Sequence, residues 1–320
     1  MKQTVLTGIK CTGTPHVGNY LGAIAPAIAR ADMADASSYF FLADYHALNQ
    51  IKDARELQQS VREIACTFLA CGLDPKRTVF YRQSDVPEVF ELSTILGNMT
   101  PKGLMNRAHS YKAAVQKNTD AGRDVDDDVN IGLYTYPILM AADILIMGTN
   151  FVPVGQDQKQ HIEMTADIAK SFNAVFGNTF TIPKEIIRED VAIIPGLDGR
   201  KMSKSYNNTI PLFCSSAELL KLIKRIETDS SAPTDPKPTD HMIFQLYKHF
   251  AGTEMNNKIG WGDAKQKLFD TMDKFITPMR DKYNHLMANY HEVEKILDDG
   301  AARARVVARD MIDRVRQCLK

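Results

Sequence analysis

The stretch VLTGIKCTGTPHVGNYLG at residues 5–22 decides the fold of this 320-residue chain. Its first five residues, VLTGI, are apolar or β-branched and predict a strand. The glycines, threonines and proline that follow predict a loop, and TPHVGNYLG at 14–22 is where a helix should begin. A strand that leads through a glycine-containing turn into a helix is typical of a parallel α/β sheet.

The alternation of strand and helix continues through the first two hundred residues. Short apolar runs bounded by Gly, Pro or Asp predict further strands at 39–44, 78–82, 151–155 and 191–194. Helical spacing of apolar residues predicts helices at 54–71, 86–98, 132–147 and 157–176. The expected fold class is therefore α/β, with a Rossmann-like parallel sheet that binds ligands beyond the carboxyl ends of its strands.

The strand pattern ends near residue 208, and only helical periodicity follows. Helices are expected at 215–226, 239–250, 264–289 and 301–319, with a Pro- and Asp-rich connector, APTDPKPTD, at 232–240. We therefore expect two domains: a Rossmann-like domain at 1–208 and a helical domain at 209–320.

The composition excludes several classes of protein. Lys and Arg number 39, as do Asp and Glu, so the zero net charge excludes a uniformly basic nucleic-acid coat. The most apolar stretch, 138–147, is too short to cross a bilayer, and the first residues do not form a signal peptide. Five scattered cysteines without a CxxC pair indicate free thiols in a reducing compartment. A cytoplasmic protein without a membrane segment is expected.

Two short motifs point to chemistry on a nucleotide. His16 and Asn19, beside Gly18 at a strand-to-helix turn, could present an imidazole, an amide and backbone N–H groups to phosphate oxygens. RKMSKS at 200–205 supplies cations that could reach a triphosphate. Alone, the first motif also fits a turn that caps a helix, and the second a solvated basic loop. Their combination in one α/β domain favours a nucleotide site.

These motifs resemble the two signature motifs of the class I aminoacyl-tRNA synthetases. Further segments are similar to the tryptophanyl-tRNA synthetase family: MTPKGLMNRAHSYK at 99–112, LYTYPILMAADILI at 133–146, NFVPVGQDQKQHIEMTADIA at 150–169 and FTIP at 180–183. The resemblance extends over nearly the whole first domain, and the chain length suits the compact bacterial members.

The resemblance implies an ATP site. Its catalytic residues would be His16 and Asn19, near the adenine and phosphates, and Lys201 and Lys204, on the pyrophosphate. The other nucleotide contacts would come from Gly18, Met202 and Ser203, from Gly155 and Asp157 at the ribose, and from Lys112 as a third phosphate lysine.

The resemblance also implies a tryptophan site. Asp143 would accept the indole N–H and Met140 would pack on the ring, while Tyr136 and Gln158 would hold the α-ammonium group. His46 would lie just behind the substrate. A carboxylate in an apolar helix is costly unless it is paired, and the indole nitrogen is a donor only. The alternative is that Asp143 bonds a neighbouring backbone N–H or a lysine.

Two positions depart from the family pattern, and one pair suggests a metal. Leu6 stands where many bacterial members have phenylalanine, which thins the aromatic packing around the indole. Lys10 stands where glutamine is usual, which puts a cation near the substrate carboxylate. Asp157 and His161 lie four residues apart on a helix, but two ligands are too few for a metal site, so none is expected.

The implied activity is ATP-dependent activation of L-tryptophan, followed by its transfer to the terminal adenosine of tRNA(Trp). Mg²⁺ would accompany ATP, the protein would be a homodimer, and the helical domain would bind the tRNA anticodon. Three alternatives stay open: the tyrosyl branch, which also uses an aspartate on this helix; a synthetase-like binding protein; and a small-molecule adenylyltransferase. YTYPIL before MAAD, with GQDQKQH, favours the tryptophan branch, and the intact KMSKS disfavours a non-catalytic protein.

Overall fold

The computed structural model describes residues 2–31, 36–187 and 194–320. Within these residues, parallel strands form one sheet in the order β3-β2-β1-β4-β5. The strands are β1 (Gln3–Lys10), β2 (Ala36–Ala43), β3 (Thr78–Arg82), β4 (Phe151–Val154) and β5 (Lys184–Ile187). The chain turns to opposite sides of β1 when it forms β2 and β4, so the crevice beyond β1 and β4 is the expected ligand position.

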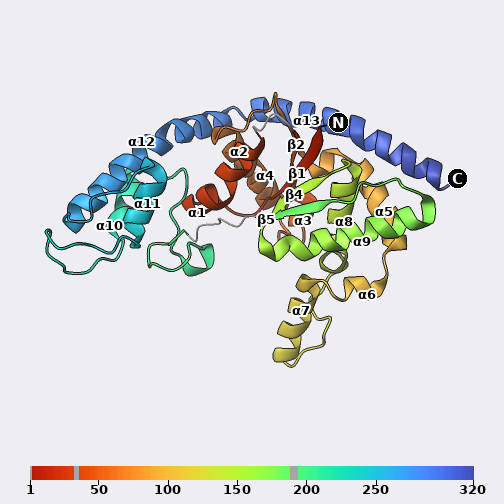
Figure 1. Cartoon of the computed structure of the whole chain (residues 1–320), viewed down its shortest axis with the longest axis horizontal. Helices are drawn as coiled ribbons and strands as arrows, with labels where there is room; N and C mark the ends of the chain where they lie inside the picture. The colour runs from red at the N-terminus through yellow and green to blue at the C-terminus, as the bar shows by residue number, and fades with distance from the viewer. Residues whose placement is uncertain (1, 32–35, 188–193) are drawn as a thin grey trace.

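Helices surround the sheet and then continue as a helical region (Figure 1). Those of the N-terminal part are α1 (Val17–Asn19), η1 (Tyr20–Ile24), α2 (Ala25–Ala31), α3 (Asp44–Ala47), α4 (Ala54–Ala70), η2 (Gln83–Asp85), α5 (Glu88–Met99), α6 (Lys102–Met105), α7 (His109–Asp120), α8 (Ile131–Ile146), η3 (Gln156–Gln158) and α9 (Lys159–Phe176), of which α6 and α7 project away from the sheet (Figure 1). η4 (Lys204–Tyr206) follows before the C-terminal part, whose helices are α10 (Ser216–Lys224), α11 (Met242–Ala251), α12 (Trp261–Ala288) and α13 (Tyr290–Cys318). None of the described helices has the length and apolar character needed to cross a membrane.

Local sequence explains where the main elements begin and how they are covered. Phe40, Phe41 and Leu42 are all buried in β2, because a central parallel strand has helices on both faces. α4 begins at Asp53, whose carboxylate accepts the N–H of Glu56 at 2.8 Å. The burial of β2 on both faces and the start of α4 therefore follow from the local sequence.

The last helix returns to the sheet. Figure 1 shows α12 and α13 as one long arc that runs from the helical region across to the sheet. α13 packs against β3 and α5, and its Ala301, Ala304 and Ala308 belong to the same buried cluster as Val152 of β4. Residues beyond 208 therefore complete the core that covers the sheet. The domain boundary expected at residue 208 stays a prediction.

The expected α/β class with a C-terminal helical region is confirmed. The strands expected at 5–9, 39–44, 78–82 and 151–155 correspond to β1 to β4. The strand expected at 191–194 falls on residues of which only Ile194 is described. The sequence reasoning missed β5 and α7, because each is short or weakly amphipathic.

The contact between α13 and β3 can be tested at Gly300. A Cβ on Gly300 would lie 1.8 Å from the backbone oxygen of Phe80, so a side chain forces the helix away from the strand. Gly300→Ala is expected to lower the free energy of unfolding by about 1–3 kcal/mol, as overpacking does. The measurement is urea unfolding followed by circular dichroism.

Gly97→Ala in α5 is the matched control. No atom lies within 4 Å of its added Cβ, so the substitution is expected to be neutral or to stabilise by up to about 1 kcal/mol. Equal effects of the two substitutions would show that α13 does not pack closely on β3.

Candidate functional site

The histidine loop (residues 11–19) leads from β1 into α1, and its polar side chains bond one another. Nδ1 of His16 accepts the backbone N–H of Asn19 at 3.2 Å, while Oδ1 of Asn19 accepts the N–H of His16 at 3.1 Å. This reciprocal capping box sets the start of the helix. Burial, reinforced by the charge of Lys204, lowers the pKa of His16 to about 4, so the imidazole stays neutral and able to accept.

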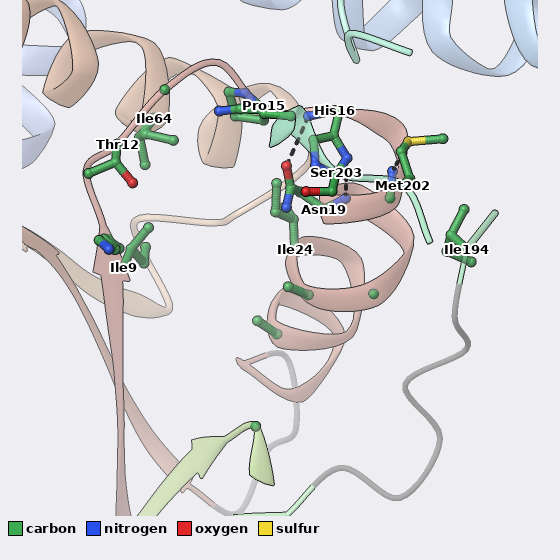
Figure 2. Close-up of a pocket in the computed structure, with 18 of the residues that line it drawn as sticks. Ile9, Thr12, Pro15, His16, Asn19, Ile24, Ile64, Ile194, Met202 and Ser203 are labelled. Atoms are coloured by element: carbon green, nitrogen blue, oxygen red, sulfur yellow. Dashed lines mark hydrogen bonds between the residues drawn. The ribbon is translucent and has the colours of Figure 1, made fainter. Parts of the chain in front are cut away.

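The lysine loop (residues 196–208) lies directly against the histidine loop. The chain just after it pairs with the histidine loop: Val17 N–H donates to the Ile210 carbonyl at 2.9 Å, and Leu212 N–H to the Pro15 carbonyl at 3.0 Å. Figure 2 shows Met202 and Ser203 facing His16 and Asn19. The N–H of Gly18 points at the Met202 sulfur at 3.3 Å. Two motifs nearly two hundred residues apart therefore form one surface.

Lys204 reaches across this surface to the histidine loop. Gly13 has a φ of +64°, which favours glycine, and a Cβ there would lie 2.2 Å from Nζ of Lys204 and push the end of that side chain aside. Partial burial lowers the pKa of Lys204. The ammonium group is thus held close to the helix start, where an anion would be bound.

A first cavity, of about 860 Å³, opens between the two loops beyond the ends of β1 and β4. Most of the predicted ATP residues line it: His16, Gly18, Asn19, Gly155, Lys201, Met202, Ser203 and Lys204. Asp157 does not line it; its carboxylate is exposed and accepts the amide N–H of Gln158 at 2.7 Å. Lys112 is exposed on α7 and lines neither this cavity nor the second one described below.

A second cavity, of about 470 Å³, lies beside the first, on the α8 side of β1. Four predicted tryptophan residues line it: His46, Tyr136, Met140 and Gln158. Leu6 also lines it. Asp143, the fifth predicted residue, is 3% exposed and lies behind this lining.

Asp143 is held by two side chains from other elements. Its Oδ2 is 3.0 Å from Nε2 of His46, and the amide of Gln83 donates to both carboxylate oxygens, at 3.0 and 2.8 Å. Burial raises the pKa of Asp143, and the bonds from His46 and Gln83 oppose that rise. The partners are therefore neither of the alternatives considered from the sequence, which were a backbone N–H or a lysine.

Gln83 is a member of this site that the sequence reasoning missed. It is fully buried and follows β3 directly, at the carboxyl end of the strand. A buried amide at that end of a parallel strand is a signal for a ligand site, but it becomes specific only once its partner on α8 is known.

Tyr136 and His161 form a second polar pair beside the cavity. The Tyr136 hydroxyl is hydrogen-bonded to Nε2 of His161, and the ring of Tyr136 meets that of His46 edge-on, with 6.1 Å between centroids. Burial lowers the pKa of His161 to about 4, so its imidazole is neutral. The described residues hold no group of three or more His, Cys, Asp or Glu side chains placed to bind a metal.

The two cavities share a common wall. Gly8, Lys10, Pro153, Val154 and Gln158 line both. Lys10 places a cation at this junction, and Gly8 leaves room for the Phe41 ring, whose nearest atom would lie 2.9 Å from a Cβ there. A nucleotide in the first cavity and an amine-bearing acid in the second would bring a phosphate and a carboxylate together here, which is the geometry for acyl-adenylate formation.

Comparison with known proteins identifies the family. The family model for class I tRNA synthetases (W and Y) matches residues 1–277. The tryptophan–tRNA ligase of Pseudomonas aeruginosa is 50% identical over 100% of this chain and 74% of its own length. That of Xanthomonas axonopodis pv. citri is 52% identical over 95% of this chain and 73% of its own length.

Solved structures agree. The tryptophanyl-tRNA synthetase of Campylobacter jejuni, complexed with ADP and tryptophan, superposes with a TM-score of 0.89 at 39% identity, covering 99% of each chain. A tyrosyl-tRNA synthetase from Aeropyrum pernix has a TM-score of 0.65 at 16% identity, over 93% of this chain and 90% of that one, which shows a common fold alone. The chain therefore belongs to the class I tRNA synthetases, in the tryptophan–tRNA ligase family.

Proposed function

We propose that the two joined cavities are the site where this member of the tryptophan–tRNA ligase family activates L-tryptophan with ATP. The main support for this proposal is that the histidine and lysine loops lie around one cavity. This cavity shares a wall with a second cavity, and Asp143 lies behind the lining of the second one. ATP would occupy the first cavity and tryptophan the second.

The proposed chemistry needs no protein nucleophile. A carboxylate oxygen of tryptophan attacks the α-phosphorus of ATP while the bond from that phosphorus to the bridging oxygen breaks, and pyrophosphate leaves. A ribose hydroxyl of the terminal adenosine of tRNA(Trp) then attacks the acyl carbon, and AMP leaves. Because the attacking carboxylate is already ionised, the protein contributes position and charge.

Residues at the first cavity would supply that charge. Lys201 and Lys204 would lie on the departing pyrophosphate, and the neutral His16 with the backbone of α1 would face the phosphates. Gly155 and Asp157 are proposed at the ribose and Lys112 at a phosphate; both Asp157 and Lys112 would have to move inward to make those contacts. Mg²⁺ would arrive bound to the triphosphate oxygens of ATP, its usual form in such sites.

Asp143 has room for one more donor. A carboxylate offers about four lone-pair sites, and three hydrogen bonds from His46 and Gln83 engage Asp143. We propose that the indole N–H of tryptophan takes the remaining site, with Met140 against the ring and with Tyr136 and Gln158 at the ammonium group.

The quaternary and cellular setting is proposed as well. Tyr45 and Leu48 are 43% and 42% exposed, and Tyr45 stacks on Phe90 at 5.0 Å. We propose a homodimer, as the resemblance to the family implies, with these two side chains at the surface that the second copy would cover. We place the activity in the cytoplasm, where translation uses charged tRNA.

The proposed activation is tested by ATP–pyrophosphate exchange in the presence of single amino acids, followed by charging of purified tRNA(Trp). We expect exchange with L-tryptophan and little with L-tyrosine, because a site with a committed buried acceptor discriminates strongly. Exchange supported best by tyrosine, or by no amino acid, would overturn the proposal.

Replacement of Asp143 tests the indole contact. Asp143→Ala removes the acceptor and leaves Gln83 without its partner, so the KM for tryptophan is expected to rise about 10- to 100-fold, the scale of a charged hydrogen bond. The KM for ATP should change by less than about threefold. Steady-state exchange kinetics measure both, and an equal rise in the two constants would refute the assignment.

Replacement of Lys204 tests the charge on the pyrophosphate. Lys204→Ala is expected to slow adenylate formation about 10²- to 10³-fold, as loss of one charge-stabilising donor does. The dissociation constant of tryptophan, from calorimetry, should be unchanged. Lys248→Ala, at a surface lysine paired with Glu254, is the control. Normal adenylate formation by the Lys204 variant would remove this lysine from the mechanism.

The helical region is proposed to bind tRNA. Between α11 and α12, a groove of about 630 Å³ is lined by Lys267, Lys274 and one carboxylate, Asp270, together with Phe250 and Phe275. Cations beside aromatic rings suit phosphates and unstacked bases.

Replacement of both groove lysines tests that role. Lys267→Ala with Lys274→Ala is expected to raise the KM for tRNA about tenfold and to weaken its salt dependence, because two phosphate contacts are lost. Exchange without tRNA should keep its rate. An unchanged KM for tRNA in charging assays would exclude the groove.

A further inference from the structure

Asn208 ends the lysine loop and is buried within it. Asn208 is only 2% exposed, whereas Lys201 and Lys204 of the same loop are exposed. Oδ1 accepts the backbone N–H of Ser203 at 2.8 Å. Nδ2 donates to the Lys201 carbonyl at 3.1 Å and to Oδ1 of Asp198 at 2.7 Å. One amide therefore ties three points of the same loop together.

The two backbone bonds lie on either side of Met202. The Lys201 carbonyl and the Ser203 N–H are both held by Asn208, so the backbone around Met202 has little freedom. Met202 is itself buried against the N–H of Gly18 in the histidine loop. The amide of Asn208 therefore helps to set the positions from which the side chains of Lys201 and Lys204 start, alongside the backbone bond from the Met202 N–H to the Ile194 carbonyl at 2.8 Å.

Asp198 extends the same network to the start of the motif. Its carboxylate accepts from the backbone N–H of Arg200 at 3.1 Å and from Nε of Arg200 at 2.8 Å. The hydrogen bond from Asn208, followed by those from Arg200, holds the pKa of Asp198 below its usual value. Asp198, Asn208 and Arg200 are thus joined in one hydrogen-bonded network.

We propose that Asn208 is a positioning residue that holds the lysine loop in the backbone conformation from which Lys201 and Lys204 reach the triphosphate. This proposal rests on the proposed function, because it assigns the loop's lysines to pyrophosphate. Asn208 lines neither cavity and acts only through the loop. Its contribution is preorganisation: the cations are in place before the charge on the leaving group develops.

The direct test replaces the amide. Asn208→Ala removes all the side-chain bonds, and the rate of adenylate formation is expected to fall about 10- to 100-fold. The tryptophan dissociation constant should stay within about twofold, because the second cavity contains none of this loop. A substitution that merely destabilised the fold would weaken both. Asn98→Ala, at an exposed asparagine of α5 that bonds only its own helix, is the matched control.

Exchange of the two side chains, by Asn208→Asp with Asp198→Asn, separates the effect of lost hydrogen bonds from the effect of lost packing. Asn208→Asp keeps the acceptor for Ser203 but sets a carboxylate against that of Asp198, where the native atoms are 2.7 Å apart. This variant should lose at least as much rate as Asn208→Ala, since two like charges repel at that distance. Adding Asp198→Asn moves the donor of this hydrogen bond from residue 208 to residue 198. The double variant removes the charge repulsion but leaves the Lys201 carbonyl without its donor, so it should recover part of the rate lost by Asn208→Asp and stay slower than the unaltered protein.

Each outcome of these measurements either supports or overturns the proposed role of Asn208. Rate loss with retained tryptophan affinity, and recovery in the double variant, support the proposal. Unchanged rates in both single variants of Asn208, equal loss of tryptophan affinity, or no recovery in the double variant overturn it. If the unaltered protein shows no tryptophan-dependent exchange, the proposed function fails; if it does and the variants match it, only the role of Asn208 fails.

Discussion

The site depends on the pairing between the histidine loop and the chain that follows the lysine loop. Two backbone hydrogen bonds, between Val17 and Ile210 and between Leu212 and Pro15, hold together segments that the sequence separates by nearly two hundred residues. Each bond by itself contributes only about 1 kcal/mol. Their importance is geometric, because they bring Lys204 over Gly13 and the Met202 sulfur to the N–H of Gly18.

The second constraint is the buried carboxyl group of Asp143. Taking a carboxylate out of water is costly, and hydrogen bonds from His46 and Gln83 offset that cost. The two partners come from the carboxyl ends of β2 and β3, while Asp143 comes from α8. Two side-chain partners orient this acceptor before a substrate arrives, which is what selection for a donor on an aromatic ring requires.

The sequence predicted the parts of this structure that local patterns encode. The apolar runs of β1 to β4 and the amphipathic helices α4 and α9 follow from periodicity. The resemblance identified residues that line both cavities, although Lys112, Asp143 and Asp157 line neither. Partners across long sequence distances could not be predicted. Gln83 is 60 residues from Asp143, and the sequence around Gln83 does not indicate that its partner is that carboxylate. The return of α13 to β3 at Gly300 and the network around Asn208 likewise appear only when the chain is folded.

The central claim is that one continuous site spans both cavities, with the reacting atoms at Gly8, Lys10 and Gln158. The most direct test is a crystal structure with a non-hydrolysable sulfamoyl analogue of tryptophanyl-adenylate. The account predicts the adenosine between the histidine and lysine loops, the linking group at the shared wall, and the indole nitrogen within hydrogen-bond distance of Asp143. An analogue bound with its indole outside the cavity lined by Met140 and Tyr136 would contradict it.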